Sequence, residues 1–339
     1  MSNQNVVGIL GAGRIARVHA DALVKFQPGV RIKHIIDPYL TEEAAAWAKS
    51  IGVEHVSKES EDLFTDPEVD SVFICSPTPT HCDFIMRACE VKKNIYCEKP
   101  LAADIPSIHK AIAAIEKSGV KFLMGFMRRF DDNQMKLRAA IENGTIGDPQ
   151  IIKLCSRDPE PPPYAYIETS GGLYFDSMIH DFDLARYYSD SEVEEVYALG
   201  VSLVDPKIGE LGDVDTAIVS LKFASGAIGV IDLSRKSNSG YEQRTEVHGS
   251  KGCVSMGNVP ESTIQITNDS GVLSDKPVYF FLERYEKAFV TAQAAFFATV
   301  NEGKPAPVTA FDGLQAVRLA KAAQKSKDEA RPVLLSEID

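Results

Sequence analysis

Three polar residues in this sequence, Lys99, Asp176 and His180, are of the types that a metal-free alcohol dehydrogenase requires. A histidine can accept the proton of a hydroxyl group, and a nearby carboxylate can orient the ring and stabilise its protonated form. A lysine can donate a hydrogen bond to the reacting oxygen and stabilise the developing alkoxide. These groups are useful only beside a cofactor that accepts a hydride, so the same chain must bind one.

The spacing of the acidic residues around His180 predicts that they share one surface. Asp176, His180 and Asp183 follow one another at i, i+4 and i+7. A helix over Gly172–Tyr188 would turn all three toward one cleft and Asp181 away from it. Two other interpretations stay open. The three residues could ligate a divalent metal, although no further cluster completes a shell. They could also be a solvated helix face with a hydrogen-bonded core histidine. We expect no metal.

A glycine-rich segment near the N-terminus predicts a dinucleotide site. Gly11 and Gly13 follow an apolar run and precede an amphipathic stretch, and Ala16 takes the position of a third glycine. In such a turn the first glycine permits the tight bend, and the second lets the backbone approach a pyrophosphate. A small third residue allows the helix to pack on the strand. The phosphate would lie over the helix N-terminus, on its exposed N–H groups.

Asp37 strengthens this prediction and specifies the cofactor. It ends the second apolar run, 24 positions after Gly13, where a carboxylate can accept hydrogen bonds from the adenosine ribose hydroxyls. A carboxylate repels a 2′-phosphate, and Pro38 and Tyr39 follow in place of an arginine, so NAD is favoured over NADP. The alternative is that Asp37 only forms a turn before Pro38.

A second loop lies at the carboxyl edge of the predicted sheet, where ligands bind in such folds. It runs from Cys75 to His81. His81 could be a base, but we favour the interpretation that it belongs to the first turn of a helix. The residues predicted to bind the cofactor are Gly11, Gly13, Arg14, Ile15, Asp37, Ser76, Pro77, Thr78, His81, Glu98 and Lys99.

The first 125 residues alternate apolar runs with amphipathic stretches, the pattern of βαβ units. The predicted strands are Val6–Leu10, Arg31–Ile36, Val69–Cys75, Asn94–Cys97 and Lys121–Gly125. The predicted helices are Arg14–Phe26, Thr41–Ser50 with Thr41 as N-cap, Thr80–Val91 and Ile105–Ser118. The fold class is α/β: a Rossmann domain with a doubly wound parallel sheet over residues 1–125.

Residues 126–339 predict an α+β domain with a large, mostly antiparallel open sheet, because strands follow one another there without intervening helices. The expected strands are Gln150–Ser156, Glu194–Val204, Asp215–Phe223, Ala227–Ser234, Arg244–Gly249, Gly252–Met256 and Ser262–Thr267. The expected helices are Phe130–Asn143, Gly172–Tyr188, Leu282–Glu302 and Gly313–Lys325. The last two helices could pack back on the Rossmann domain. This second domain would bind the substrate and form the oligomer.

The composition of the chain limits the classes of partner that it is expected to bind. The chain has 339 residues, 44% hydrophobic and 25% charged, with a net charge of −12 that argues against nucleic acid and anionic membranes. No apolar run reaches the roughly 20 residues of a membrane span. Residues 1–5 carry no basic side chain, so we expect no signal peptide. The six cysteines form no CxxC pair and have no metal-ligand spacing, which predicts reduced, mostly buried thiols in a cytoplasmic protein.

The segments around Gly11–Ile15, Glu98–Pro100, Gly125–Asp131 and the Asp176/His180 helix, in this order, resemble the Gfo/Idh/MocA oxidoreductase family. The similarity extends over essentially the whole chain, and within the family it is greatest to the inositol 2-dehydrogenase branch. It implies Lys99, Asp176 and His180 as the catalytic residues, with His180 as the acid/base. It also implies that the open sheet supports a homotetramer, and a role in inositol catabolism.

The resemblance further implies a polyol site lined by Arg129, Asp183 and Tyr241, together with the catalytic residues Lys99, Asp176 and His180. A loop containing Asp158 resembles a cleft-lining segment of some inositol dehydrogenases; its alternatives are a surface Arg157–Asp158 pair and a rigid proline spacer. The expected reaction is the NAD-dependent oxidation of myo-inositol to 2-keto-myo-inositol (scyllo-inosose). Oxidation of another inositol isomer or a sugar, and a non-catalytic NAD(H)-binding regulator, are the alternatives. Arg128 and Arg129 could equally clamp a carboxylate, which leaves a sugar acid or an aldose open.

Overall fold

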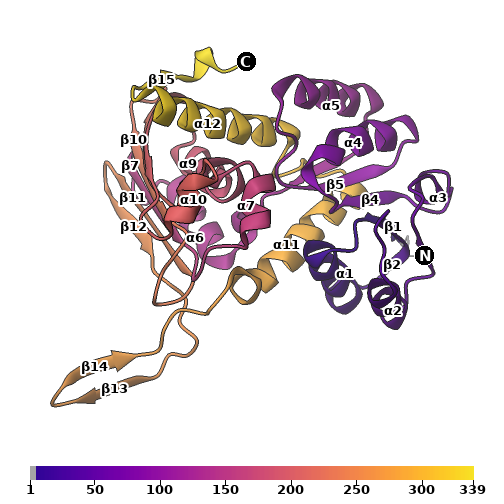
Figure 1. Cartoon of the computed structure of the whole chain (residues 1–339), viewed down its shortest axis with the longest axis horizontal. Helices are drawn as coiled ribbons and strands as arrows, with labels where there is room; N and C mark the ends of the chain where they lie inside the picture. Colours follow the sequence, from indigo (N-terminus) through magenta and orange to yellow (C-terminus); the bar gives the residue numbers. More distant parts are fainter. Residues whose placement is uncertain (1–4) are drawn as a thin grey trace. The chain divides into compact units, whose positions relative to one another are not determined.

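The computed structural model describes residues 5–339, which form two compact units (Figure 1). The first unit comprises the chain up to Phe130 together with Lys287–Val317. The second comprises Asp131–Glu286 and Arg318–Asp339. The division between them therefore runs through two long helices, α11 (Phe281–Glu302) and α12 (Ala310–Glu329), in addition to the crossing after Phe130. Residues 1–4, to which the signal-peptide prediction partly refers, lie outside the described residues.

The first unit contains a six-stranded sheet in the order β3-β2-β1-β4-β5-β6, and all of its strand pairs are parallel. The predicted doubly wound Rossmann sheet is thereby confirmed. Its strands are β1 (Asn5–Leu10), β2 (Val30–Ile36), β3 (His55–Ser57), β4 (Ser71–Ile74), β5 (Asn94–Glu98) and β6 (Phe122–Gly125). Every residue of β1 and β4 is buried, as expected for parallel strands covered on both faces.

The helices of this unit begin where the local sequence supplies a cap. Thr41 caps α2 by accepting from Ala44 N at 3.1 Å, as predicted, and Asp104 caps α5 by accepting from Ser107 N at 2.9 Å. The helices are α1 (Arg14–Phe26), α2 (Glu42–Ser50), α3 (Glu61–Phe64), α4 (His81–Glu90) and α5 (Ile105–Ser118), with 3₁₀ turns η1 (Thr78–Thr80) and η2 (Met127–Phe130). The short elements β3 and α3 were not expected.

The second unit is built on a seven-stranded sheet in the order β12-β11-β7-β10-β9-β8-β15. Only β7 and β10 pair in parallel, so the prediction of a mostly antiparallel sheet is confirmed. The strands are β7 (Pro149–Arg157), β8 (Val193–Val201), β9 (Thr216–Phe223), β10 (Ile228–Ser234), β11 (Glu242–Gly249), β12 (Gly252–Met256) and β15 (Val333–Leu334).

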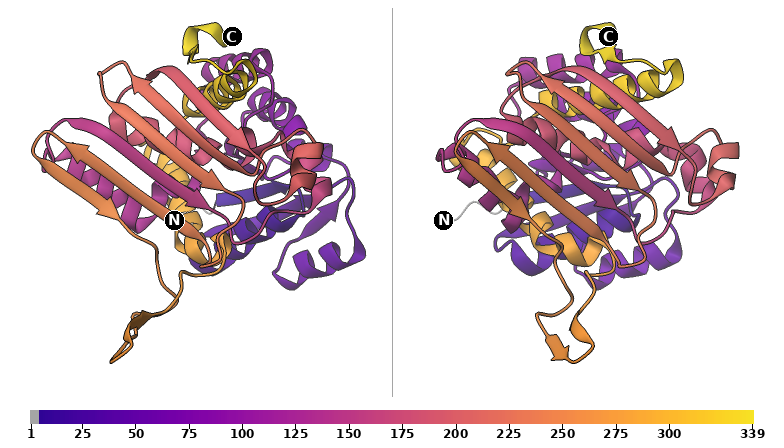
Figure 2. Two further views of the ribbon diagram at one scale, coloured as in Figure 1. Left: turned by 60° about the vertical axis from the view of Figure 1, so that its left-hand side comes forward. Right: turned by 90° about the vertical axis from the view of Figure 1, so that its left-hand side faces the viewer.

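One face of this sheet belongs to the core of the second unit and the other is open. Along β9 buried and exposed residues alternate, which is the pattern of a strand covered on one face. Figure 2 shows the outer face without a covering helix from the described part of the chain. The helices of this unit are α6 (Asp132–Glu142), α7 (Tyr164–Ser170), α8 (Leu173–Asp176), α9 (Ile179–Ser189) and α10 (Pro206–Glu210), with a C-terminal 3₁₀ turn η3 (Leu335–Glu337).

Two local predictions were wrong. The helix expected over 172–188 is broken at Ser177 and Met178, so Asp176 ends α8 while His180 and Asp183 belong to α9. The strand expected over 262–267 is instead β13 (Gln265–Asn268), which pairs with β14 (Gly271–Ser274) in a separate hairpin. This hairpin projects from the second unit (Figure 1), and all of its strand residues are exposed. None of the helices in residues 5–339 has the length and apolar character to cross a membrane.

Candidate functional site

The glycine turn after β1 has the shape that the sequence predicts. Gly11 has φ +105°, and a Cβ atom there would lie 2.6 Å from the carbonyl oxygen of Cys75. Only glycine fits both the dihedral angle and this close approach. A Cβ atom at Gly13 would have no atom within 4 Å, so the backbone is open to a ligand at this position.

The N-terminus of α1 can hold an anion. Gly13 is its N-cap and supplies no side-chain hydrogen bond, in contrast to the capped starts of α2 and α5. The first N–H groups of a helix have no partner within the helix and favour negative charge, so a pyrophosphate fits here. Arg14 and Ile15 form the first turn, and Ala16 is fully buried against the sheet.

A pocket of about 470 Å³ opens beside this turn, within the first unit. Its walls include the glycine turn, Asp37 and the segments Tyr39–Thr41, Lys58–Ser60 and Ser76–Pro77. Asp37 Oδ2 accepts a hydrogen bond from Ala12 N, and Oδ1 accepts one from Tyr39 N, both at 2.8 Å. Asp37 therefore shapes the turn before Pro38 and also faces the pocket. Each carboxylate oxygen can accept a second bond, which suits the two hydroxyl groups of a ribose.

His81 joins the two loops at the carboxyl edge of this sheet. Its Nδ1 lies 2.7 Å from the carbonyl oxygen of Pro100, its Nε2 lies 2.8 Å from that of Ser76, and the residue is buried. Burial lowers the pKa of His81, against the opposing effect of the two carbonyl oxygens. The helix α4 begins at His81, as the favoured interpretation predicts. Its contacts hold the loops that precede Pro77 and follow Lys99.

Asp176 lies in a cluster of the second unit that contains a buried cation. Its Oδ1 accepts from the Tyr166 hydroxyl at 2.9 Å, and its Oδ2 lies 3.8 Å from Arg235 Nη1. Arg235 is fully buried, and its Nη2 lies 3.1 Å from Asp213 Oδ2. Asp213 in turn accepts from Leu173 N at 2.9 Å, at the start of α8. The cluster fixes the end of α8 where Asp176 is located.

His180 and Asp183 are buried, with 6% and 1% of their surface exposed. The interpretation of this segment as a solvated helix face is therefore wrong, because α9 is buried from Ile179 through Arg186. A buried histidine and buried carboxylates need polar partners, and this is a setting in which an acid/base can be held in one orientation.

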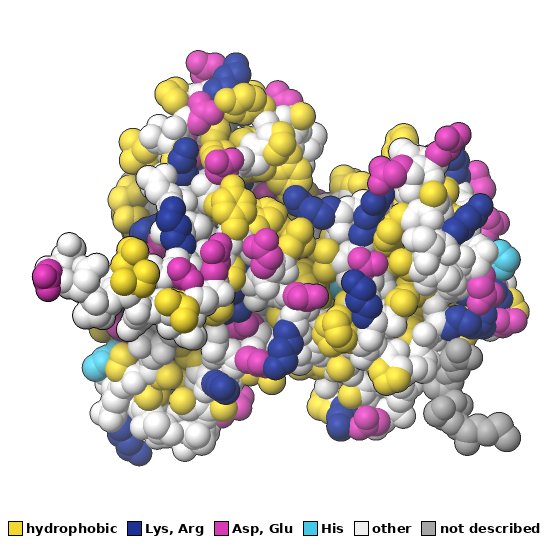
Figure 3. Space-filling model, turned by 90° about the horizontal axis from the view of Figure 1, so that it is seen from below, with side chains coloured by type: hydrophobic (Ala, Val, Ile, Leu, Met, Phe, Trp, Pro, Cys, Tyr) yellow, Lys and Arg dark blue, Asp and Glu magenta, His cyan; other side chains and the backbone are white. Residues whose placement is uncertain are grey.

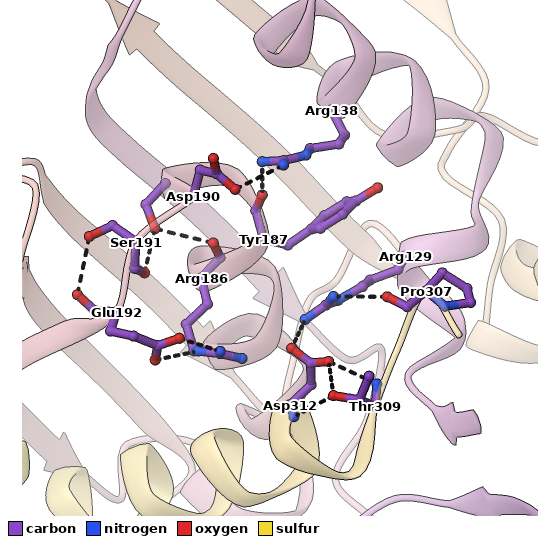
Figure 4. A network of polar contacts seen from close by, with 11 residues as sticks. Arg129, Arg138, Arg186, Tyr187, Asp190, Ser191, Glu192, Pro307, Thr309 and Asp312 are labelled. Carbon is purple, nitrogen blue, oxygen red and sulfur yellow. Dashed lines mark hydrogen bonds and ion pairs between the residues drawn. The ribbon is translucent and has the colours of Figure 1, made fainter. Parts of the chain in front are cut away.

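Arg129 is engaged by its own unit (Figure 4). Its Nη2 lies 3.1 Å from Asp312 Oδ1, and its Nη1 lies 3.5 Å from the carbonyl oxygen of Pro307. Asp312 Oδ2 also accepts from Thr309 N at 2.8 Å, so the acid is fixed at the start of α12. Arg129 is 8% exposed, and part of its hydrogen-bonding capacity is used by these contacts. Figure 4 also shows, within the second unit, Arg186 paired with Glu192 and Arg138 with Asp190.

The remaining predicted substrate residues lie in the second unit. Tyr241 is 3% exposed, and its ring meets that of Tyr285 edge to face at 6.0 Å. Asp158 follows β7, and its N–H donates to Ser234 O at 3.1 Å. Arg157 binds Asp232 at 2.6 Å and Glu242 at 3.0 Å, so it is held by acids other than Asp158. These contacts do not support the alternative of a surface ion pair between Arg157 and Asp158.

The predicted residues are thus divided between the units. The cofactor residues, Lys99 and Arg129 belong to the first unit; Asp158, Asp176, His180, Asp183 and Tyr241 belong to the second. Within residues 5–339, no group of three or more His, Cys, Asp and Glu side chains could hold a metal ion. Sequence reasoning missed Arg235 and Tyr166 beside Asp176, and also His19, which contacts Glu98, and Gln293, which contacts His19. All four lack a local motif, and their contacts arise only in the fold.

Two family models match the chain. One, described as the oxidoreductase family with an NAD-binding Rossmann fold, matches residues 6–126. The other, the GFO/IDH/MocA C-terminal domain, matches residues 135–255. The chain belongs to the GFO/IDH/MocA oxidoreductase family. The part of the chain that matches the NAD-binding Rossmann fold contains the glycine turn, the N-terminus of α1 and the pocket beside Asp37.

Relatives within the GFO/IDH/MocA family match the chain over its full length. An uncharacterized oxidoreductase, YrbE, from Bacillus subtilis is 44% identical over 100% of this chain and 99% of its own. The myo-inositol 2-dehydrogenase of Thermotoga maritima is 43% identical over 98% of this chain and 99% of its own. The scyllo-inositol dehydrogenase of Lactobacillus casei, solved with NAD(H) and scyllo-inositol, is 28% identical. It has a TM-score of 0.91 and covers 98% of this chain and 100% of its own.

Proposed function

We propose that this protein is an NAD-dependent dehydrogenase that oxidises a secondary hydroxyl group of a cyclic polyol. The leading substrate is myo-inositol, which would give 2-keto-myo-inositol (scyllo-inosose) and NADH. The observation that carries the proposal is the 43% identity, over 98% of the chain, with a myo-inositol 2-dehydrogenase. Residues 1–125 would hold the cofactor, and residues 126–339 would bind the polyol and form the oligomer.

The proposed chemistry assigns one role to each residue. NAD, when bound, supplies the acceptor for the hydride that leaves the carbinol carbon. His180 takes the hydroxyl proton at an imidazole nitrogen as this carbon is oxidised. Lys99 donates to the same oxygen and stabilises its developing negative charge. Asp176 would orient His180 and balance its charge, and the contacts of Asp176 with Tyr166 and Arg235 hold the carboxylate in place. The convergence of Lys99 and His180 on one oxygen is part of the proposal.

The substrate class follows from the mixture of polar groups. A ring of hydroxyl groups needs both donors and acceptors, and Arg129, Asp158, Asp183 and Tyr241 would supply them together with the catalytic residues. The engagement of Arg129 with Asp312 supports an uncharged substrate, because this guanidinium already balances a carboxylate. A sugar acid is less well served by the same arrangement.

The test is a panel of initial rates with NAD. Myo-inositol, scyllo-inositol, other inositol isomers, aldoses and sugar acids would be compared by kcat/KM for NADH formation. The proposal predicts that myo-inositol gives the highest kcat/KM. Poor turnover of every inositol, with good turnover of an aldose, would move the protein to another substrate of the same family. Binding of NADH without turnover of any compound would instead support a non-catalytic regulator.

We also infer that the protein assembles as a homotetramer in the cytoplasm. The open face of the seven-stranded sheet exposes Leu199, Ile218 and Ile228, and Leu199 and Ile218 are register partners on β8 and β9. The projecting hairpin exposes Ile266 and Leu273, and a two-stranded hairpin is at best marginally stable alone. Two isologous contacts per subunit are what a tetramer of two-fold axes needs. Free cysteines, five of them buried, suit a reducing compartment.

Size-exclusion chromatography with light scattering measures the molar mass of the assembly directly. Wild-type protein should elute as a tetramer, whereas Ile218→Glu should weaken contact through the sheet face and Leu273→Glu contact through the hairpin. Each variant should then elute as a dimer. A monomeric wild type, or tetramers in both variants, would contradict the inferred assembly.

A further inference from the structure

A chain of buried hydrogen bonds in the first unit connects three elements and ends at Lys99. Gln293 of α11 lies with its Nε2 3.1 Å from His19 Nδ1 and 3.1 Å from His19 O, in α1. His19 Nε2 lies 2.8 Å from Glu98 Oε1, at the end of β5. Lys99 N donates to Glu98 Oε2 at 3.3 Å. His19 and Gln293 are fully buried, and Glu98 is nearly so.

The direction of every hydrogen bond in this chain follows from one carbonyl group. His19 O can only accept, so the atom of Gln293 that faces it must be the amide nitrogen. That same nitrogen donates its other hydrogen to Nδ1, so Nδ1 carries no proton. The neutral imidazole then has its proton on Nε2, which donates to Glu98 Oε1. Glu98 accepts on both oxygens, as an ionised carboxylate does.

The surroundings of His19 hold its ring in one orientation. Phe73, Tyr96 and Phe289 meet its ring edge to face, with centroids at 5.7, 4.9 and 5.4 Å. Packing against three aromatic rings leaves the imidazole no space to turn. The ring is thus a rigid connector with a single tautomer between an amide on α11 and a carboxylate on β5.

We propose that His19 and Gln293 are positioning residues, which fix Glu98 and through it the backbone of Lys99. The inference rests on the proposed function only in its last step, the role of Lys99 beside the reacting oxygen. His19 and Gln293 have no part in the chemistry assigned to the reaction. The relay explains why three fully or nearly buried polar residues from α1, β5 and α11 are joined in one place. Since small displacements of a catalytic group reduce the rate strongly, the relay should control turnover.

The tautomer can be read without any substrate. The full-length protein is labelled with ¹⁵N-histidine, and His19 is assigned by the signal that disappears in His19→Gln. The ring nitrogen shifts should show a protonated Nε2 and an unprotonated Nδ1. A proton on Nδ1, or a doubly protonated ring, would overturn the relay.

Two substitutions of nearly equal shape then test the positioning role. Gln293→Glu replaces the donor to Nδ1 by an acceptor, so His19 must reverse its tautomer or take a second proton. Gln134→Glu, at another buried glutamine in the second unit, is the control for a buried carboxylate. Gln293→Glu should lower kcat by about 10–100-fold and change KM for NAD less than about threefold. Gln134→Glu should leave both constants within about threefold of the wild type.

Conservative rescue separates positioning from stability. His19→Gln keeps an N–H that can reach Glu98, whereas His19→Leu leaves Oε1 without this donor, so kcat should be higher in the glutamine variant at equal thermal stability. Equal kcat in both variants, or in Gln293→Glu and the wild type, would overturn the positioning role. A wild type that oxidises no inositol would instead refute the proposed function. The ring nitrogen shifts would still show whether His19 has the tautomer that the hydrogen-bond relay requires.

Discussion

Arg235 Nη1 lies 3.8 Å from Asp176 Oδ2, and the guanidinium that it belongs to is fully buried. Its Nε and Nη1 have no hydrogen-bond partner among the described residues. The guanidinium therefore compensates the carboxylates of Asp213 and Asp176 mainly by its positive charge. A buried cation that balances two carboxylates cannot be removed without leaving them uncompensated.

Arg235→Met is therefore expected to lower the free energy of unfolding by about 3–5 kcal/mol. Urea denaturation followed by circular dichroism measures this loss. Arg235→Lys keeps the charge and should lose less. Turnover per folded molecule should also fall, because Asp176 loses its contact with the Arg235 guanidinium. A methionine variant as stable and active as the wild type would show that the cluster does not depend on this cation.

The assigned chemistry predicts separate effects on binding and turnover. His180→Ala and Lys99→Ala should retain NADH binding, measured by nicotinamide fluorescence, because the glycine turn and Asp37 are unchanged. Turnover should fall by at least about 100-fold in each variant, the usual scale for loss of an acid/base group. Unchanged turnover in either variant would remove that residue from its role.

The position of Asp37 predicts the choice of cofactor. Asp37→Asn keeps an oxygen for Ala12 N but removes the charge that repels a 2′-phosphate. The ratio of kcat/KM for NAD to that for NADP should therefore fall at least about tenfold, equivalent to about 1.4 kcal/mol. Steady-state rates with both cofactors give this ratio. A wild type that prefers NADP would contradict the prediction directly.

Burial of His81 predicts how stability depends on pH. Since burial lowers its pKa below the ordinary value of about 6.5, the unfolded chain binds a proton more readily than the folded one. Its contribution to stability is therefore full above pH 6.5 and is lost as the pH falls toward the folded pKa. The slope should reach at most about 1.4 kcal/mol per pH unit. Unfolding free energies from pH 7.5 to 5 measure it, and His81→Gln should show a smaller slope; an equal slope would exclude His81 as the cause.

The sequence predicts the parts of the fold whose signals are local. The strand–turn–helix of β1 and α1, the Thr41 cap and the bounds of α5 are set by apolar runs, capping side chains and glycines within a few residues. The break at Ser177 and Met178 has no such signal, because the apolar periodicity continues across it. The break separates Asp176 from the helix of His180. The contacts that hold α8 in place, such as that of Leu173 N with Asp213, join residues that are distant in the sequence.

The candidate site, like the fold, was predictable from the sequence only where its signals are local. The glycine turn and Asp37 are each recognisable from the residues around them, and both line one pocket in the structure. The partners that hold the polar residues come from far along the chain: Gln293 is 274 positions from His19, and Asp312 is 183 from Arg129. The sequence does not reveal contacts between residues so far apart. Sequence reasoning therefore predicts a substrate role for Arg129 but does not predict its ion pair with Asp312.

The central claim, transfer of a hydride from a polyol carbon to NAD, is tested most directly with myo-inositol deuterated at C2. The protein is incubated with NAD and this substrate, and the reduced cofactor is analysed by mass spectrometry. We predict that NADH gains one deuterium and that the ketone product retains none at C2. Reduced cofactor without deuterium, or none formed while unlabelled sugars are oxidised, would contradict the account.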